Sequence, residues 1–122
     1  MSLKKRIQSF RYAFKGLADV IRTQANMRIH LAAMAIVIPA AWLFRVSSGE
    51  WLALILVTGF VLAAEAFNTA IEYLTDLASP QHHPLAGKAK DAAAAAVLLA
   101  AFAAFGVGLV VFLPRIFRFL SQ

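Results

Sequence analysis

AAAAAVLLAAFAAFGVGLVVFLP, residues 92–114, runs for 23 residues without a charged side chain. A helix of about 20 apolar residues crosses the hydrocarbon core of a bilayer, which is about 30 Å thick. The segment is therefore predicted to be a transmembrane helix. Its five consecutive alanines, at 92–96, are typical of a surface on which helices pack closely.

Two further apolar segments precede this one. The segment 51–75 begins at a tryptophan and carries no charge until Glu65, and the segment 27–45 has an uncharged centre. Both are long enough to span a membrane. The short polar connection between them contains Gly49, which we expect to form the turn. The predicted fold is an all-α integral membrane protein with three transmembrane helices.

Composition supports a membrane setting. Of the 122 residues, 61% are hydrophobic and only 15% are charged, which is too apolar for a soluble domain of this size. The absence of cysteine excludes disulfides and thiolate metal sites. The net charge of +6 is concentrated near the start of the chain, where it suits anionic lipid headgroups. Nucleic acid is not expected as a partner, because the rest of the chain favours lipid.

The first segment, 3–22, has the pattern of an amphipathic helix. Its apolar residues recur at steps of four and three, and basic residues occupy the other faces. We expect this helix to lie in the plane of the membrane surface. A signal peptide is a weaker interpretation, because no small-residue cleavage site follows a compact apolar run.

A polar loop is expected over residues 76–91, between the second and third spans. If the amino terminus is cytoplasmic, this loop is cytoplasmic too, and nine of the twelve Lys and Arg residues lie on that side. Cytoplasmic segments of membrane proteins are enriched in these residues. The distribution of charge thus predicts a multi-pass protein with a cytoplasmic amino terminus.

Polar side chains recur along one face of the second span. Their spacing is three or four residues, or close to multiples of these, which places them on one side of a helix: Glu65, Asn68, Thr69, Glu72 and Asp76. An ionised carboxylate at the membrane centre costs about 3 kcal/mol, so such groups usually face protein or serve a function.

The depths of the two glutamates suggest different roles. Glu65 is expected just beneath the headgroups, where a carboxylate can act as general base toward a lipid hydroxyl. Glu72 is expected nearer water, where it can hold a metal ion bound to a nucleotide. Lys88 and Lys90, beside Asp91, could neutralise the oxygens of a transferring phosphate.

Simpler interpretations of these residues remain open. Glu65 and Asn68 could make hydrogen bonds between helices of an oligomer, and the basic loop residues could be interfacial anchors. His82 and His83 lack a third ligand at suitable spacing, which favours ordinary loop residues over a metal site. The carboxylates would also suit a non-enzymatic oligomeric channel or transporter, and a structural membrane subunit is a further alternative.

Two separated motifs carry a family resemblance. EAFNTAIE at 65–72, followed by Asp76, and HHPLAGKAKD at 82–91 resemble the signature of the prokaryotic diacylglycerol kinases, a family that also contains undecaprenol kinases. FRYAFKGL at 10–17 and NMRIH at 26–30 extend the similarity over nearly the whole chain.

The resemblance implies a homotrimer in the bacterial inner (cytoplasmic) membrane, with active sites formed by neighbouring subunits near the cytoplasmic interface. It implies transfer of the γ-phosphate of ATP, with Mg²⁺, to a membrane lipid alcohol, either undecaprenol or diacylglycerol. The form of the motif over 83–91 is more similar to the undecaprenol kinases.

The resemblance also implies roles for single residues. Glu65 would be the catalytic base and Glu72 the Mg²⁺ ligand, with support from Asn68 and Asp76. Contacts to the nucleotide would come from Tyr12, Glu72, Gln81, His82, His83, Lys90 and Asp91. Further basic residues would support the site: Lys5, Arg6, Lys15 and Arg28.

Two positions depart from the family pattern. Gln24 stands where well-studied members have a second metal-binding glutamate. An amide oxygen can bind magnesium but adds no negative charge, so a second metal would be held more weakly. Ala95 stands where many undecaprenol-type relatives have glycine, and it adds a methyl group at a close-packed position.

Overall fold

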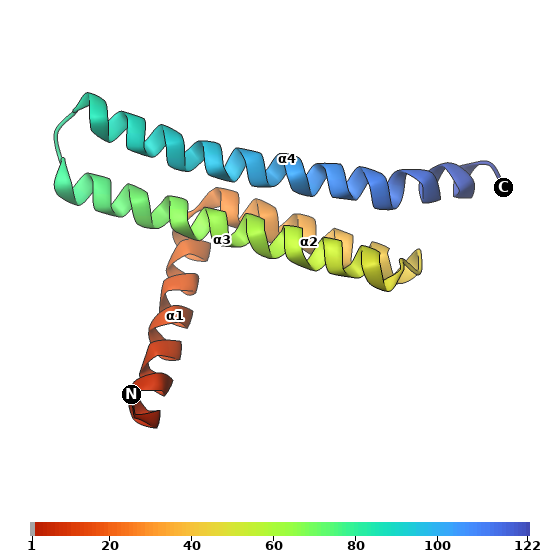
Figure 1. Ribbon diagram of the computed structural model, residues 1–122, viewed down its shortest axis with the longest axis horizontal. Coiled ribbons are helices and arrows are strands. Elements are labelled where there is room, and N and C mark those ends of the chain that lie inside the picture. The colour runs from red at the N-terminus through yellow and green to blue at the C-terminus, as the bar shows by residue number, and fades with distance from the viewer. Residues whose placement is uncertain (1) are drawn as a thin grey trace.

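The computed structural model describes residues 2–122, and within this range every regular element is a helix. The four helices are α1 (Leu3–Thr23), α2 (Ala25–Leu43), α3 (Ser48–Ala78) and α4 (Pro84–Leu120). The two longest, α3 and α4, lie antiparallel and side by side, α2 lies along α3, and α1 projects away from these three (Figure 1).

Three helices are long and apolar enough to cross a membrane, as the sequence predicts: α2 with 19 residues, α3 with 31 and α4 with 37. At about 1.5 Å per residue, α3 is about 46 Å long and α4 about 55 Å. Both exceed the thickness of a hydrocarbon core of about 30 Å. Their polar ends therefore extend beyond the apolar layer as continuous helix.

The loop expected over 76–91 is much shorter in the structure. Helix α3 continues through Ala78 and α4 begins at Pro84, so only five residues connect them. Proline is favoured in the first turn of a helix because its missing N–H has no partner there. The His83 side chain accepts a hydrogen bond from the N–H of Leu85, at 3.1 Å, and caps the helix. Asp76 and Lys90 therefore lie on helices.

The turn between α2 and α3 is centred on Arg45 and not on Gly49. Arg45 is the residue with left-handed backbone, at φ 51°. The N–H of Val46 donates to the Ala41 carbonyl at 3.2 Å, as in a Schellman motif at a helix C-terminus. Gly49 lies inside the first turn of α3, where Ser47 and Glu50 form a capping box.

The apolar core lies at the same end of the bundle as this turn. Ala41, Val46, Leu54 and Val111 form a buried cluster that joins α2, α3 and α4. Beside it, the guanidinium of Arg115 donates to both carboxylate oxygens of Glu50, at 2.6 Å each. Helix α4 continues past Pro114, where the predicted span ends, to Leu120.

Candidate active site

The polar stripe predicted on α3 faces the protein interior. Glu65, Asn68 and Thr69 are the buried polar side chains of residues 2–122, and Glu65 is only 1% exposed. The Thr69 hydroxyl donates to the Glu65 carbonyl at 3.0 Å, which is a bond within the helix. The Asn68 amide donates to Glu72 Oε1 at 3.2 Å. Asn68 thereby bonds to the shallower of the two carboxylates.

His30 of α2 faces Glu65. Its Nε2 lies 3.7 Å from Glu65 Oε2, which is too long for a hydrogen bond. Within residues 2–122, His30 Nε2, both Glu65 carboxylate oxygens and Asn68 Oδ1 are buried without a hydrogen-bond partner. Buried polar atoms are nearly always paired with protein or water, so these four atoms make the region a candidate functional site.

Sequence reasoning did not identify His30 as a site residue. A single histidine in an apolar segment carries no signal by itself, and its meeting with Glu65 depends on how α2 packs against α3. The weak signal available was its inclusion in the NMRIH motif at 26–30.

Asp76 and Lys90 join the ends of α3 and α4 on the side of the short connection. Lys90 Nζ lies 2.5 Å from Asp76 Oδ1, and both side chains are largely exposed. The family resemblance implies that Lys90 and Asp91 both contact the nucleotide. In the structure Lys90 pairs with a carboxylate of the neighbouring helix, and Asp91 is exposed.

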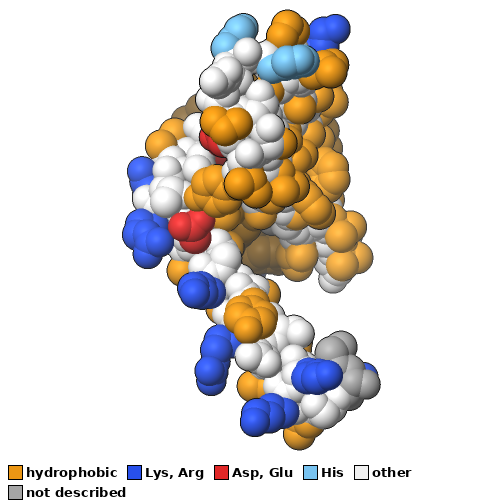
Figure 2. Space-filling model, turned by 90° about the vertical axis from the view of Figure 1, so that its left-hand side faces the viewer, with side chains coloured by type: hydrophobic (Ala, Val, Ile, Leu, Met, Phe, Trp, Pro, Cys, Tyr) orange, Lys and Arg blue, Asp and Glu red, His pale blue; other side chains and the backbone are white. Residues whose placement is uncertain are grey.

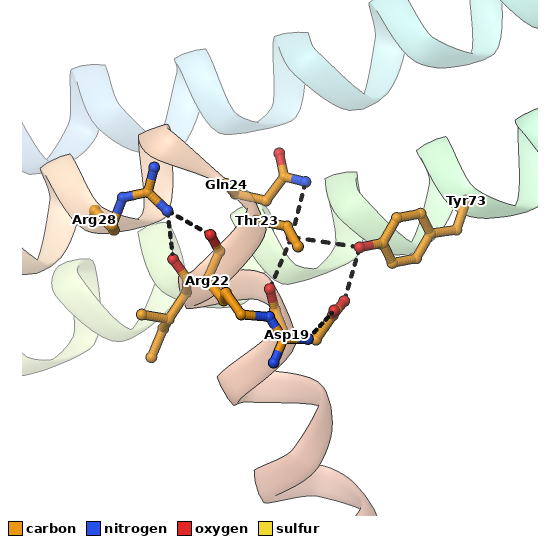
Figure 3. A network of polar contacts seen from close by, with 7 residues as sticks. Asp19, Arg22, Thr23, Gln24, Arg28 and Tyr73 are labelled. Atoms are coloured by element: carbon orange, nitrogen blue, oxygen red, sulfur yellow. Dashed lines mark hydrogen bonds and ion pairs between the residues drawn. The ribbon is translucent and has the colours of Figure 1, made fainter.

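A second polar network ties α1 to α3 (Figure 3). The Tyr73 hydroxyl donates to Asp19 Oδ2 at 2.7 Å and lies 3.4 Å from the Thr23 hydroxyl. The Gln24 side-chain amide donates to Thr23 at 3.3 Å. Asp19 and Tyr73 lie 54 positions apart on different helices, so no local pattern predicts their contact.

Arg28 has a structural partner in this region. Its Nη1 donates to the carbonyls of Ile21 and Arg22, at 2.8 Å each. Carbonyls in the last turn of a helix lack partners within the helix, and a basic side chain there satisfies them. Arg28 therefore fixes the corner between α1 and α2.

The remaining predicted site residues are spread over the surface. Figure 2 shows histidine side chains on the part of this face that lies away from the Lys and Arg side chains of α1. The Tyr12 hydroxyl accepts a hydrogen bond from Gln8 of the same helix. One chain does not bring these groups together around the α3 stripe. The exposed residues concerned are Lys5, Arg6, Tyr12, Lys15, Gln81, His82 and His83.

No three His, Asp or Glu side chains converge in a metal-binding group within residues 2–122. Magnesium does not require such a group, because it commonly binds one or two carboxylates together with phosphate oxygens and water. Glu72 is half-buried, near the end of α3, and suits such a limited ligand set.

Comparison with known proteins places the chain among lipid kinases. The family described as prokaryotic diacylglycerol kinase matches residues 11–112. An undecaprenol kinase of Bacillus subtilis (strain 168) is 40% identical over 114 residues, which cover 93% of each chain. A diacylglycerol kinase of Pseudomonas aeruginosa is 35% identical over 98 residues, 80% of each chain.

A diacylglycerol kinase of Synechocystis sp. is 45% identical over 107 residues, which are 87% of this chain and 61% of the relative. The match thus spans less than two-thirds of that relative. The family match, by contrast, runs from α1 through most of α4 and includes His30, Glu65, Glu72 and Lys90. The chain belongs to the prokaryotic diacylglycerol kinase family.

Proposed function

We propose that this protein is a lipid kinase, which transfers the γ-phosphate of ATP to the hydroxyl of a membrane lipid alcohol. The observation that carries the proposal is the Glu65 carboxylate, which is buried in an apolar helix with both oxygens unpaired. A carboxylate in that state needs a partner, and the hydroxyl of a lipid is the donor that the bilayer can deliver to it.

Glu65 acts as the general base in this reaction. The lipid hydroxyl gives its proton to the Glu65 carboxylate while its oxygen forms a bond to the γ-phosphorus. The bond between that phosphorus and the β,γ-bridging oxygen breaks, and its electron pair leaves with ADP. Phosphoryl transfer requires chiefly positioning and charge stabilisation, so a short polar stripe can support it.

Glu72 is the residue we assign to the metal. Bound Mg²⁺ supplies positive charge that offsets the charge of the ATP phosphates. Glu72 stands one helical turn from Asn68 and two from Glu65, which places it on the same face and closer to the α3 terminus. Gln24 is the second candidate ligand, through its neutral amide oxygen.

The nucleotide contacts require more than one chain in this proposal. In a single subunit Lys90 lies beside Asp76 of the α3 stripe, whereas Tyr12 lies on α1, which projects away from the other helices. A homotrimer would place α1 or the α3–α4 connection of one subunit beside the α3 stripe of the next. The basic residues of α1 would then lie at the cytoplasmic surface of a bacterial inner membrane, with α1 in the membrane plane.

For the acceptor we propose undecaprenol ahead of diacylglycerol. Both kinds of enzyme occur among the relatives, since the B. subtilis protein is an undecaprenol kinase and the Synechocystis protein is a diacylglycerol kinase. The relative that matches over 93% of both chains is the undecaprenol kinase. The motif over 83–91 favours the same acceptor.

The test offers undecaprenol and diacylglycerol in parallel, in detergent micelles with Mg²⁺ and ATP labelled at the γ-phosphate. We expect label in undecaprenol, and we expect Glu65→Gln to lower the rate at least about a hundredfold, as loss of a general base does. The matched control is Glu50→Gln, at the opposite end of α3, with the folding of each variant checked by size-exclusion chromatography.

The outcomes separate the parts of the proposal. Label in diacylglycerol alone would correct the acceptor and retain the kinase. Near-normal turnover by Glu65→Gln would remove Glu65 from the role of base. No label in either lipid, from folded wild-type protein, would contradict the proposed function and favour a channel-like role for the buried carboxylates.

A further inference from the structure

An apolar cavity of about 350 Å³ lies between α2, α3 and α4. Its walls carry two polar side chains, His30 and Thr58. The Thr58 hydroxyl is satisfied within its own helix, since it donates to the Leu54 carbonyl at 2.7 Å. His30 Nε2 is not satisfied by any group of residues 2–122. His30 therefore lies between the cavity and Glu65, and its unpaired Nε2 is buried on the side that faces Glu65.

The His30 and Glu65 side chains face each other without bonding. Their closest polar atoms are 3.7 Å apart and make no direct hydrogen bond. An oxygen atom that lies beside the line between these two atoms, about 2.8 Å from each, would bond to both once the side chains shift to admit it. A hydroxyl fits, because it can accept a hydrogen bond from an imidazole N–H and donate one to a carboxylate.

We propose that His30 positions the hydroxyl of the acceptor lipid for attack. Its Nε2–H donates to the hydroxyl oxygen while the hydroxyl donates its own proton to Glu65, and the hydrocarbon next to the hydroxyl lies in the cavity. This inference rests on the proposed kinase function. It assigns the acceptor class as an alcohol at the end of a hydrocarbon chain, held by one donor and one acceptor.

The arrangement also gives partners to the unpaired atoms of His30 and Glu65. Burial of a polar atom without a partner costs free energy, and a ligand that supplies the partner recovers it. A molecule that lacks the hydroxyl leaves His30 and Glu65 unpaired, and the site therefore selects against it. A methyl ether of the same lipid can accept from His30 but cannot donate to Glu65.

The experiment compares His30→Leu with His30→Gln in the wild-type background. Leucine fills space but has no donor, whereas the glutamine amide carries an N–H at a similar reach. Asn26→Leu is the matched control, because it makes the same polar-to-apolar change at an exposed position one turn earlier on α2. Turnover and KM are measured for the lipid and for ATP, with the lipid methyl ether as competitor.

We expect His30→Leu to lower lipid turnover about 10- to 100-fold, the effect of a lost hydrogen bond in a charged site. KM for ATP should stay within about twofold, because His30 does not touch the nucleotide. His30→Gln should recover most of the rate, and Asn26→Leu should match the wild type. The methyl ether should compete less well than the alcohol against both enzymes, because it cannot donate to Glu65 in either, and both ligands should bind less tightly to His30→Leu.

Either of two results would overturn the inference while leaving the kinase intact. One is wild-type turnover by His30→Leu. The other is an equal loss in His30→Leu and His30→Gln, which would mean that His30 has a packing role only. A wild-type protein without lipid kinase activity would instead contradict the proposed function itself, so the two failures are distinguishable.

Discussion

At the scale of single residues, Gln24 is the position where a substitution should change the Mg²⁺ requirement of the enzyme. It lies between α1 and α2, and its side-chain nitrogen is bonded to Thr23. The labelled view shows its amide oxygen directed away from that bond (Figure 3). A carboxylate at the same place would add a full negative charge where the amide has only a dipole.

We therefore expect Gln24→Glu to lower the Mg²⁺ concentration needed for half-maximal lipid phosphorylation. A drop of about threefold or more is the size expected for one added charge near a divalent ion. The control is Asn26→Asp, which adds the same charge two residues away at an exposed position. If both variants shift the midpoint equally, the effect is a general attraction of cations and position 24 does not contact the metal.

The sequence predicts some members of the site and not others, for a physical reason. Glu65, Asn68 and Glu72 share one helix, so their spacing alone places them on one face. His30 and Tyr73 meet their partners across helix contacts, which depend on how whole helices pack. A side-chain contact between two helices produces no regular spacing in a single sequence, so it can be identified only from the folded structure.

At the scale of elements, the existence of every helix is predictable from the sequence, but their ends are not. Apolar runs mark the part of each helix that lies in lipid. The helix ends are set by local hydrogen bonds instead, such as the cap from His83 at the start of α4 and the capping box at Ser47. Such bonds extend α3 and α4 well past their apolar segments.

The turn between α2 and α3 gives a test of this local chemistry. Left-handed backbone costs a residue with a side chain about 1 kcal/mol, and glycine avoids this cost. Glycine inside a helix instead costs about 0.5–1 kcal/mol relative to alanine. We expect both Arg45→Gly and Gly49→Ala to raise the midpoint of thermal unfolding in detergent, measured by circular dichroism.

A Cβ at position 49 would meet no heavy atom closer than 4.0 Å, so Gly49→Ala should introduce no clash. The reverse assignment, with the turn at Gly49, predicts that Gly49→Ala destabilises the protein. Gly59→Ala, in the middle of α3 and with open space around a Cβ, is the control for a simple gain in helix propensity.

At the scale of the whole molecule, the two ends of the bundle differ in character. One end carries the short α3–α4 connection and the Asp76–Lys90 pair, and α1 leaves the other helices part-way along α3 on this side of its middle (Figure 1). The other carries the apolar core, the Glu50–Arg115 pair and the C-terminus. The polar stripe on α3 points toward the first end. The groups that we propose for chemistry therefore lie toward the same end of the bundle.

The orientation of that side can be measured directly, because the chain has no cysteine of its own. We expect Ser121→Cys to react with a membrane-impermeant maleimide in intact spheroplasts. Gln81→Cys should react only after the membrane is permeabilised, because the amino-terminal side is predicted to be cytoplasmic. The opposite labelling pattern would mean an extracytoplasmic amino terminus and would place the proposed site away from cellular ATP.

The polar stripe of α3 has a further consequence for the direction of the proposed reaction. Glu65 and Glu72 are two helical turns apart, about 10 Å along the axis. The polar face of α3 thus connects the hydrocarbon region with the aqueous interface over a short distance. A neutral alcohol can occupy the position near Glu65 at little cost in free energy. A phosphate monoester is charged, and burial of its charge in a low-dielectric region is unfavourable. The phosphorylated product therefore favours the more hydrated position near Glu72. Its movement there leaves the deeper position near Glu65 free for the next lipid alcohol.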